Sequence, residues 1–460
     1  MEDTICAVST APGAGGIAVI RISGPEAIAI CNTIFVPRTA GKGLLSQKAY
    51  TLRYGSIRRG EELIDEVLIA LFRAPHSFTG EDTVEITCHG SVYIQQQIMQ
   101  LLIERGCRSA LPGEYTQRAF MNGKMDLSQA EAVADLIAST SAGQHRLALN
   151  QMRGGFSHEL KNLREQLLHI TSLMELELDF SDHEELEFAD RSELSTLAAH
   201  IETVISRLAN SFSVGNAIKN GIPVAIIGET NAGKSTLLNV LLNEDKAIVS
   251  DIHGTTRDVI EDTINIGGIT FRFIDTAGLR ETTDPIEALG IERSRQALNR
   301  AAIVISVVDS SQPHHSPIAD IHTATPDIPT ILLLNKSDLT DEASLSTSSV
   351  VADNVTVIPF STKTGQGHQQ LLSTLTTIAD RLRGTTDEDT ILVTNLRHAQ
   401  ALREAAASTA AILDGLRTNL PGDLIAQDLR ATLHHLSSIT GTLTTPDILA
   451  SIFSRFCIGK

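Results

Sequence analysis

The sequence predicts a multidomain protein of mixed class, with a doubly wound α/β domain inserted into an all-α domain and a separate α/β domain at the N-terminus. Three observations predict this fold class. The chain has 460 residues, too many for one ordinary core. Between Ile222 and Arg383, apolar runs typical of buried strands alternate with helical segments, which indicates a largely parallel sheet. Helical periodicity dominates the segments on both sides of that region.

Residues 1–122 have the sequence pattern of a separate α/β domain. Glycine and proline separate short β-type runs from one clear helix. The expected strands are Ile17–Ile22, Val67–Phe72 and Val84–Cys88, and the expected helix is Val92–Arg105.

Residues 123–220 and 384–460 have the apolar spacing of amphipathic helices. One stripe in the first segment contains Leu160, Leu163, Leu167, Ile170, Leu173 and Met174. The acidic run 182–193 that follows is interpreted as a solvated connection between helices. Neither segment is rich enough in apolar surface to form a core alone, so we expect the two to pair. They would then form one helical domain, interrupted by the doubly wound domain over residues 221–383.

Composition argues against several classes of protein. No apolar run approaches the ~18 residues of a membrane-spanning helix, and the acidic start does not resemble a secretory signal. Five cysteines without C-x-x-C spacing predict reduced thiols in a cytoplasmic protein, with no zinc site. A formal net charge of −18 argues against a nucleic-acid coat protein, although it leaves room for a local basic face.

Gly228–Ser235, with the sequence GETNAGKS, matches the phosphate-binding pattern G-x-x-x-x-G-K-[ST] between a predicted strand and a predicted helix. A chance glycine-rich turn is the alternative, and the strand–loop–helix context disfavours it. Loop N–H groups and the helix N-terminus bind phosphate, and Lys234 adds a positive charge. We expect Ser235 to bind Mg²⁺, with Thr256 as the second protein ligand of that ion.

Three further motifs follow in the order that a GTP-binding domain requires. Asp275–Gly278 (DTAG) ends a predicted strand and places an acid near the metal and an amide near the γ-phosphate. Asn335–Asp338 (NKSD) ends another strand, and the Asp338 carboxylate can accept from two N–H groups of guanine that adenine does not offer as a pair. Ser361–Gly365 (STKTG) supplies a second wall for the base.

The motifs together predict an enzyme that hydrolyses GTP to GDP and phosphate, with a domain of the Ras-like superclass. The predicted GTP-binding residues are Asn231, Ala232, Gly233, Lys234, Ser235, Thr236, Ser250, Asp251, Ile252, His253, Gly254, Thr255, Thr256, Asp275, Thr276, Ala277, Gly278, Asn335, Lys336, Asp338, Ser361, Thr362 and Lys363.

One position departs from the Ras-like pattern. Those enzymes place a glutamine after the glycine of the DxxG motif to orient the attacking water, and here that position is Leu279. Another residue must therefore orient the water. Arg257 is the nearest arginine, but a side chain beside a metal-ligating threonine tends to point away from the phosphates.

Four motifs together resemble those of the TrmE/MnmE-type GTPases: G-x-x-N-x-G-K-S, G-T-T-R-D, D-T-A-G-L-R and N-K-x-D. These GTPases are bacterial and organellar enzymes that modify the wobble uridine of certain tRNAs. The resemblance extends to Gly13–Gly24, Ser77–Gly90, Pro112–Ile137 and the closing FCIGK (Phe456–Lys460). It therefore covers all three regions of the chain. Thr230 departs from the proline usual in the family, and Ser250 stands where threonine is common.

This resemblance implies that the N-terminal domain dimerises and binds tetrahydrofolate as its 5-formyl or methylene form. The implied folate contacts are Arg21, Glu81, Lys124 and Lys460. It also implies that K⁺ joins the nucleotide site and performs the electrostatic work of an arginine finger. The implied potassium positions are Asn231, Ser250, Ile252 and Thr255. The water-orienting residue of the family corresponds to Glu287.

The implied function is the addition of a carboxymethylaminomethyl or aminomethyl group to C5 of the wobble uridine, together with an FAD-dependent partner. The alternative is a switch GTPase that acts as a binding module, for example in ribosome assembly. The nucleotide motifs do not separate the two, whereas the N-terminal motifs and FCIGK favour tRNA modification. Two interpretations of Cys457 stay open: a small buried hydrophobic residue, or a catalytic or positioning thiol.

Overall fold

The structure is a computed structural model, and it divides the chain into two compact units. The first unit comprises Met1–Ile137, Leu149–Glu202 and Glu404–Lys460, and the second comprises Ala138–Ala148 and Thr203–Arg403. The predicted domain boundaries at 122, 220 and 383 stay predictions. The residues that the structure describes are 3–39, 43–179, 191–229, 231–245, 262–274, 298, 300–311, 328–339, 354–383, 390–454, 456 and 458–459.

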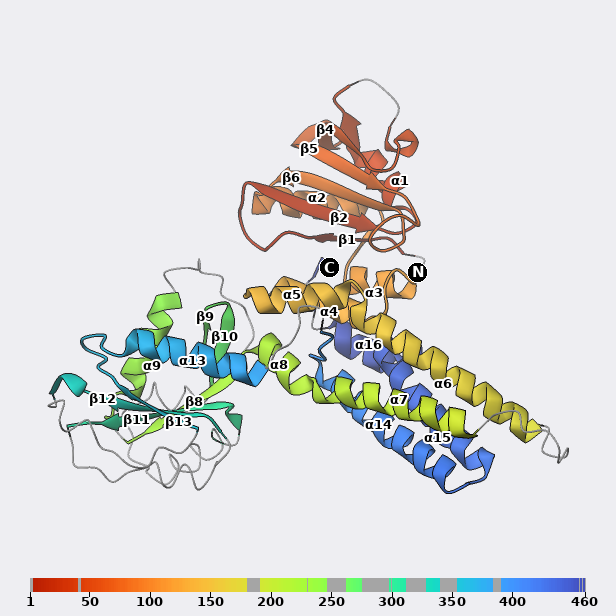
Figure 1. The fold of residues 1–460 in the computed structure, drawn as a ribbon. Helices are drawn as coiled ribbons and strands as arrows, with labels where there is room; N and C mark the ends of the chain where they lie inside the picture. The colour runs from red at the N-terminus through yellow and green to blue at the C-terminus, as the bar shows by residue number, and fades with distance from the viewer. Residues whose placement is uncertain are drawn as a thin grey trace. The chain divides into compact units, whose positions relative to one another are not determined.

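A seven-stranded sheet in the first unit has the order β3-β4-β5-β6-β2-β1-β7 (Figure 1). Its neighbours pair antiparallel, except that β1 and β7 are parallel. The three predicted strands are confirmed, and four shorter or more polar strands were not predicted. The strands are β1 (Ile5–Val8), β2 (Ile17–Ser23), β3 (Phe35–Pro37), β4 (Thr51–Arg59), β5 (Glu62–Phe72), β6 (Thr83–His89) and β7 (Arg108–Ser109).

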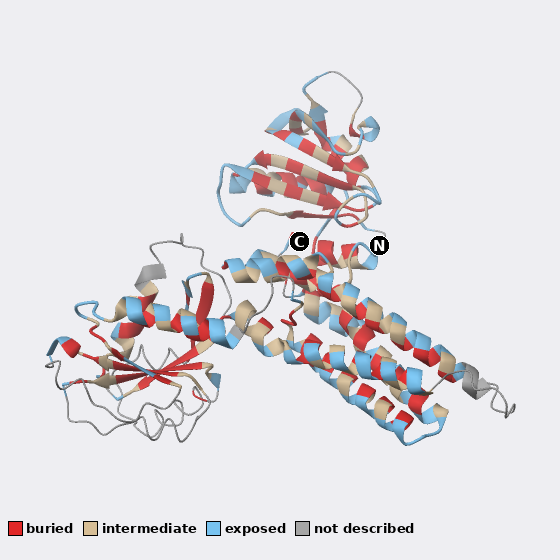
Figure 2. Cartoon of the chain, viewed as in Figure 1, coloured by how far each residue is buried: buried red, intermediate tan, exposed pale blue. Residues whose placement is uncertain are grey.

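Helices α1 (Ala27–Ile34) and α2 (Val92–Glu104) pack on one face of this sheet, and the 3-10 turn η1 (Leu44–Ser46) packs beside α1. Alternate strand residues such as Ile20, Ile69 and Ile86 are fully buried against these helices. Figure 2 shows the resulting bands of buried residues along the strands. Because strand side chains alternate between faces, the opposite face carries a second, more exposed set.

The helical segments on the two sides of the inserted domain do pair, as predicted, through α6 and α15 (Figure 1). Five of the six predicted stripe residues on α6 are buried, and Leu173 is half-buried. Among the described helices, none combines the length and apolar character that crossing a membrane needs. The helices are α3 (Glu114–Met121), α4 (Leu127–Ala138), α5 (Ala142–Met152), α6 (Gly155–Asp179), α7 (Arg191–Asn210), α8 (Phe212–Asn220), α14 (Leu396–Arg417), α15 (Gly422–Thr440) and α16 (Pro446–Phe453).

The second unit contains a six-stranded sheet with the order β13-β12-β11-β8-β10-β9, parallel except for β9. This is the predicted doubly wound domain. Chain order reverses between β8 and β11, the place where such sheets bind ligands at their carboxyl edge. The elements are β8 (Ile222–Gly228), α9 (Lys234–Asp245), β9 (Asp262–Ile266), β10 (Ile269–Ile274), β11 (Ile303–Asp309), β12 (Thr330–Asn335), η2 (Ser337–Leu339), β13 (Val355–Pro359) and α13 (His368–Arg383).

The end of the chain packs closely on the start of α3. Phe453 and Phe456 are buried in a small cluster with Leu127 and Ala130. Gly113 has a φ of +68°, and a Cβ atom built there would lie 2.6 Å from the carbonyl oxygen of Phe453. A residue with a side chain would therefore push α16 away from α3.

Beyond this contact, the tail reaches the first strand of the sheet. The hydroxyl of Ser9 donates a hydrogen bond of 3.1 Å to the carbonyl oxygen of Gly459. A Cβ atom on Gly459 would collide with the carbonyl oxygen of Val8. The residue before the C-terminal Lys460 is thus held at the end of β1.

We expect Gly113→Ala to lower the free energy of unfolding by about 1–3 kcal/mol more than Gly123→Ala, because only the first change overfills a packed contact. Both glycines have a φ of +68°, so the two variants share the same backbone strain, and a Cβ at Gly123 would meet nothing within 4 Å. Urea unfolding of the full chain measures the difference. Equal losses would show that the close contact with Phe453 contributes nothing.

Candidate functional sites

The loop between β8 and α9 brings backbone groups and one positive charge together. Gly228, at the end of β8, has a φ of +147°, and a side chain there would collide with the carbonyl oxygen of Val307. Asn231 adopts the left-handed conformation with a φ of +66°, which asparagine tolerates better than most residues. The Lys234 ammonium donates to the carbonyl oxygens of Gly228 at 2.8 Å and Glu229 at 2.7 Å. Burial lowers the pKa of Lys234.

The side chain of Asn335, at the end of β12, connects this loop to the turn after β13. Its amide nitrogen donates to the carbonyl oxygen of Ala232 at 2.7 Å, and the N–H of Thr362 donates to its amide oxygen at 3.3 Å. Asn335 is 1% exposed, and a Cβ atom on Gly233 would collide with its amide nitrogen. One buried side chain therefore sets the spacing of three predicted nucleotide-binding segments.

Asp338 and Lys336 of the same motif are each held by a side chain from another strand end. The hydroxyl of Ser361 donates to the Asp338 carboxylate at 2.7 Å. Lys336 forms an ion pair with Asp309, the last residue of β11. Although burial alone would raise it, the hydrogen bond from Lys336 keeps the pKa of Asp309 below its usual value. Three strands thus support the loop that carries Asp338.

The structure brings the described members of the predicted nucleotide site to the carboxyl ends of β8, β12 and β13. These members are Asn231–Thr236, Asn335, Lys336, Asp338 and Ser361–Lys363. The predictions for Ser250–Thr256, Asp275–Gly278, Glu287, Cys457 and Lys460 lie outside the described residues.

A second cluster lies in the first unit, around the loop 75–81. The Arg21 guanidinium forms an ion pair of 2.8 Å with Glu85 on the neighbouring strand. Its Cζ atom lies 5.7 Å from the ring centroids of both Phe78 and Tyr115, within the range of cation–π contacts. Phe78 is 38% exposed, so this loop presents an aromatic face beside a cation.

Glu81 is the last residue of this loop, and Lys124 contacts the first. Glu81 accepts a hydrogen bond of 2.8 Å from Ser23 and bonds of 3.2 Å from Arg118. The Lys124 ammonium donates to the carbonyl oxygen of Pro75 at 3.1 Å. Three of the four residues implied as folate contacts therefore lie in or touch one short loop, so that two cations, a carboxylate and an aromatic ring gather around it.

Two residues of these clusters were missed in the sequence. Asp309 ends an apolar run and could have been found, because acids at the carboxyl ends of parallel strands often serve a site. Arg118 gave no signal, since a single arginine in a short helix usually lies at the surface. Its side chain is fully buried here.

Three features define the class of protein as a P-loop GTPase: the doubly wound sheet, the G-x-x-x-x-G-K-S loop after β8 and the N-K-x-D motif after β12. Additional α/β and helical domains accompany this GTPase domain.

Two family models match the chain. One, described as the GTP-binding protein TrmE N-terminus, matches residues 4–124, and the other, described as the MnmE helical domain, matches residues 127–457.

Whole-length relatives agree with the family models. The tRNA modification GTPase MnmE of Parabacteroides distasonis is 65% identical, with 99% of this chain and 100% of that protein covered. The protein of the same name from Bacteroides thetaiotaomicron is 60% identical, with both chains covered completely. This chain belongs to the MnmE family of tRNA modification GTPases.

Proposed function

We propose that the protein is a potassium-activated GTPase that, with an FAD-dependent partner, modifies C5 of the wobble uridine of certain tRNAs using a one-carbon unit carried by tetrahydrofolate. The observation that carries the proposal is the pairing of two clusters in one chain: a nucleotide loop beside the Asn335 and Asp338 side chains, and the charged, aromatic loop 75–81. The names of the relatives supply the tRNA substrate. No observation favours the ribosome-assembly alternative.

On the nucleotide side, we assign the phosphates to the loop amides and Lys234, and the guanine base to Asp338. The carboxylate of Asp338 is oriented by Ser361 and exposed, so it is available to accept from the base. Ser235 lies in the first turn of α9 beside the loop and, with Thr256, would hold Mg²⁺. The metal neutralises charge that develops on the phosphates. Asp275–Gly278 would complete the site.

A potassium site is assigned to Asn231, Ser250, Ile252 and Thr255. The left-handed backbone at Asn231 and the exposure of that residue fit this role, because an amide oxygen is a suitable ligand for a hard cation. A bound monovalent cation supplies positive charge at the phosphates. Glu287 is assigned to orienting the attacking water.

For the folate, we assign Arg21, Glu81, Lys124 and Lys460. Carboxylates of a folate tail suit Lys124 and Arg21, and the N–H edge of a pterin suits a carboxylate such as Glu81. The position of Gly459 at β1 supports a role for Lys460 in the N-terminal domain. For Cys457, both a packing role and a chemical role stay open.

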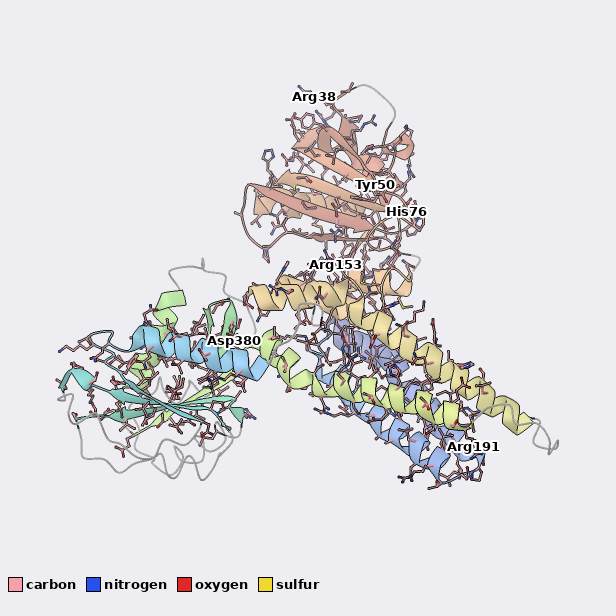
Figure 3. All side chains as sticks on the ribbon, viewed as in Figure 1. Arg38, Tyr50, His76, Arg153, Arg191 and Asp380 are labelled. Atoms are coloured by element: carbon pink, nitrogen blue, oxygen red, sulfur yellow. The ribbon has the colours of Figure 1, made fainter. Side chains whose placement is uncertain are left out.

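We further propose a cytoplasmic homodimer. The sheet face opposite α1 and α2 exposes Val36, Leu52, Tyr54 and Leu68 by 43–69%. A cluster of exposed apolar residues of this kind is typical of an interface. Arg38, which Figure 3 labels at the far edge of the same domain, pairs with Glu66 and gives the face a polar rim.

Ser361→Ala is expected to weaken the binding of guanine nucleotides by about five- to tenfold, because the Asp338 carboxylate loses a neutral donor that orients it. Titration of a fluorescent GDP analogue measures the dissociation constant. Ser310→Ala is the matched control, since its hydroxyl donates to the backbone of Asn335 and does not touch Asp338. Equal losses in the two variants would contradict the role given to Asp338.

GTP turnover is expected to be at least about tenfold faster in KCl than in NaCl at the same ionic strength, because the cation replaces an arginine finger. Asn231→Ala should remove this difference and leave GDP binding largely intact, since Lys234 and the loop amides remain. Phosphate release in the two salts is the measurement.

Equal rates in both salts would rule out the potassium site. Glu287→Ala separates the water-orienting role from the cation: it should lower kcat in KCl with little change in KM, because the contact forms in the transition state. A parallel loss of GTP affinity would mean that Glu287 is structural.

Deletion of Cys457–Lys460 should abolish wobble-uridine modification and leave GTP hydrolysis close to that of the full chain. The predicted nucleotide site lies within residues 228–365 and needs nothing from the tail, whereas the folate site draws Lys460 from it. Removing an ammonium that pairs a ligand carboxylate costs about 1–3 kcal/mol of binding.

The measurement is mass spectrometry of wobble nucleosides from a deletion strain that carries either the full or the truncated chain. Normal modification with the truncated chain would show that FCIGK is dispensable. Single changes, Cys457→Ala and Lys460→Ala, then separate the thiol from the ammonium.

A further inference from the structure

A buried arginine on α3 lies behind the proposed folate contact Glu81. The side chain of Arg118 is 0% exposed. Its guanidinium donates to the backbone oxygen of Asp3 at 2.8 Å, to the carboxylate of Asp3 at 2.7 Å and to the carboxylate of Glu114 at 2.9 Å. The same guanidinium donates to both oxygens of Glu81 at 3.2 Å.

Ser23, the last residue of β2, binds the same Glu81 carboxylate. Its hydroxyl donates to Oε2 of Glu81 at 2.8 Å and lies 2.7 Å from the hydroxyl of Thr79. Because Ser23 has one proton and gives it to Glu81, Thr79 is the donor to Ser23. Thr79 also accepts a hydrogen bond of 3.2 Å from the backbone N–H of Glu81. The serine is therefore fixed in the orientation that serves Glu81.

We propose that Arg118, assisted by Ser23, is a positioning residue that aims the Glu81 carboxylate at the N–H edge of the bound folate. A carboxylate has about four acceptor positions, and Arg118 and Ser23 occupy three of them. The open position lies on Oε1, so the carboxylate accepts from a ligand in one direction. The inference rests on the proposed function, in which Glu81 contacts the folate.

A comparison with Arg108 shows that the contact between Arg118 and Glu81 is specific to Arg118. Arg108 also pairs with Asp3 and Glu114, at 2.7 Å and 2.6 Å, but within the described part of the chain it forms no hydrogen bond or ion pair with Glu81, and its side chain is 44% exposed. Two of the three acidic partners of Arg118, Asp3 and Glu114, therefore have a second arginine. The carboxylate that Arg118 binds and Arg108 does not is that of Glu81, which makes Arg108 the control.

The experiment is a titration of the full chain with 5-formyltetrahydrofolate. Arg118→Lys keeps the charge but loses the rigid guanidinium that holds Nη1 against both oxygens of Glu81, so the dissociation constant should rise about tenfold, the effect of one charge-assisted hydrogen bond. Ser23→Ala should raise it about three- to tenfold, because it removes one hydroxyl donor to the carboxylate and leaves the two bonds from Arg118 in place. Arg108→Lys should change it less than about twofold. Circular dichroism and Tm confirm that each variant is folded.

A double-mutant cycle with Glu81→Gln separates positioning from general stability. If Arg118 acts through Glu81, adding Arg118→Lys or Ser23→Ala to Glu81→Gln produces little further loss of affinity, whereas independent structural effects add. Additive losses, or equal losses in Arg118→Lys and Arg108→Lys, would overturn the inference. Because Ser23→Ala removes only one hydroxyl and leaves the ion pairs of Arg118 in place, it gives a result even if Arg118→Lys does not fold.

The two proposals fail in different ways. If the wild-type chain does not bind 5-formyltetrahydrofolate, or if Glu81→Gln binds it normally, the assignment of Glu81 is wrong and the inference is overturned with it. If Glu81→Gln weakens binding while Arg118→Lys and Ser23→Ala bind like the wild type, only the positioning role is overturned.

Discussion

The contact of Phe453 with Gly113 is the constraint on which the organisation of the first unit depends. It brings the last helix against the start of α3 and, together with the pairing of α6 and α15, it joins Met1–Ile137 and Glu404–Lys460 in one compact unit. A domain inserted between them does not have to contribute to that core. The same contact places Gly459 at the end of β1, which is how a residue at the far end of the chain can serve a site near its beginning.

The nucleotide cluster has a different physical basis, because it follows from the direction of the strands. Parallel strands deliver their carboxyl ends to one edge, and short polar residues there can bond one another. Asn335 uses both ends of its amide in this way, toward Ala232 and Thr362. The burial of that amide makes the loss of either bond costly, so the spacing of the loops is well defined before any nucleotide binds.

The sequence predicted the features that depend on local chemistry. Glycine and lysine spacing in the phosphate loop, strand-end motifs and the apolar stripe of α6 are properties of short segments. The missed strands are either very short, such as the two residues of β7, or polar, such as β4 with its three arginines. Arg118 and Asp309 were missed for a different reason. Their roles come from partners far away in the chain, and no local pattern encodes a partner.

Burying a guanidinium is expensive, and an apolar side chain of similar size often serves stability as well or better. Arg118 is compensated by bonds to Asp3, Glu81 and Glu114, yet its Nε atom has no hydrogen-bond partner in the described part of the chain. The arrangement is therefore not the best that stability alone would favour. What it does provide is a carboxylate with one orientation at the end of the loop 75–81, which carries Phe78 and is contacted by Arg21 and Lys124. The burial of the Arg118 guanidinium is therefore better explained by the binding of a ligand at Glu81 than by the stability of the fold.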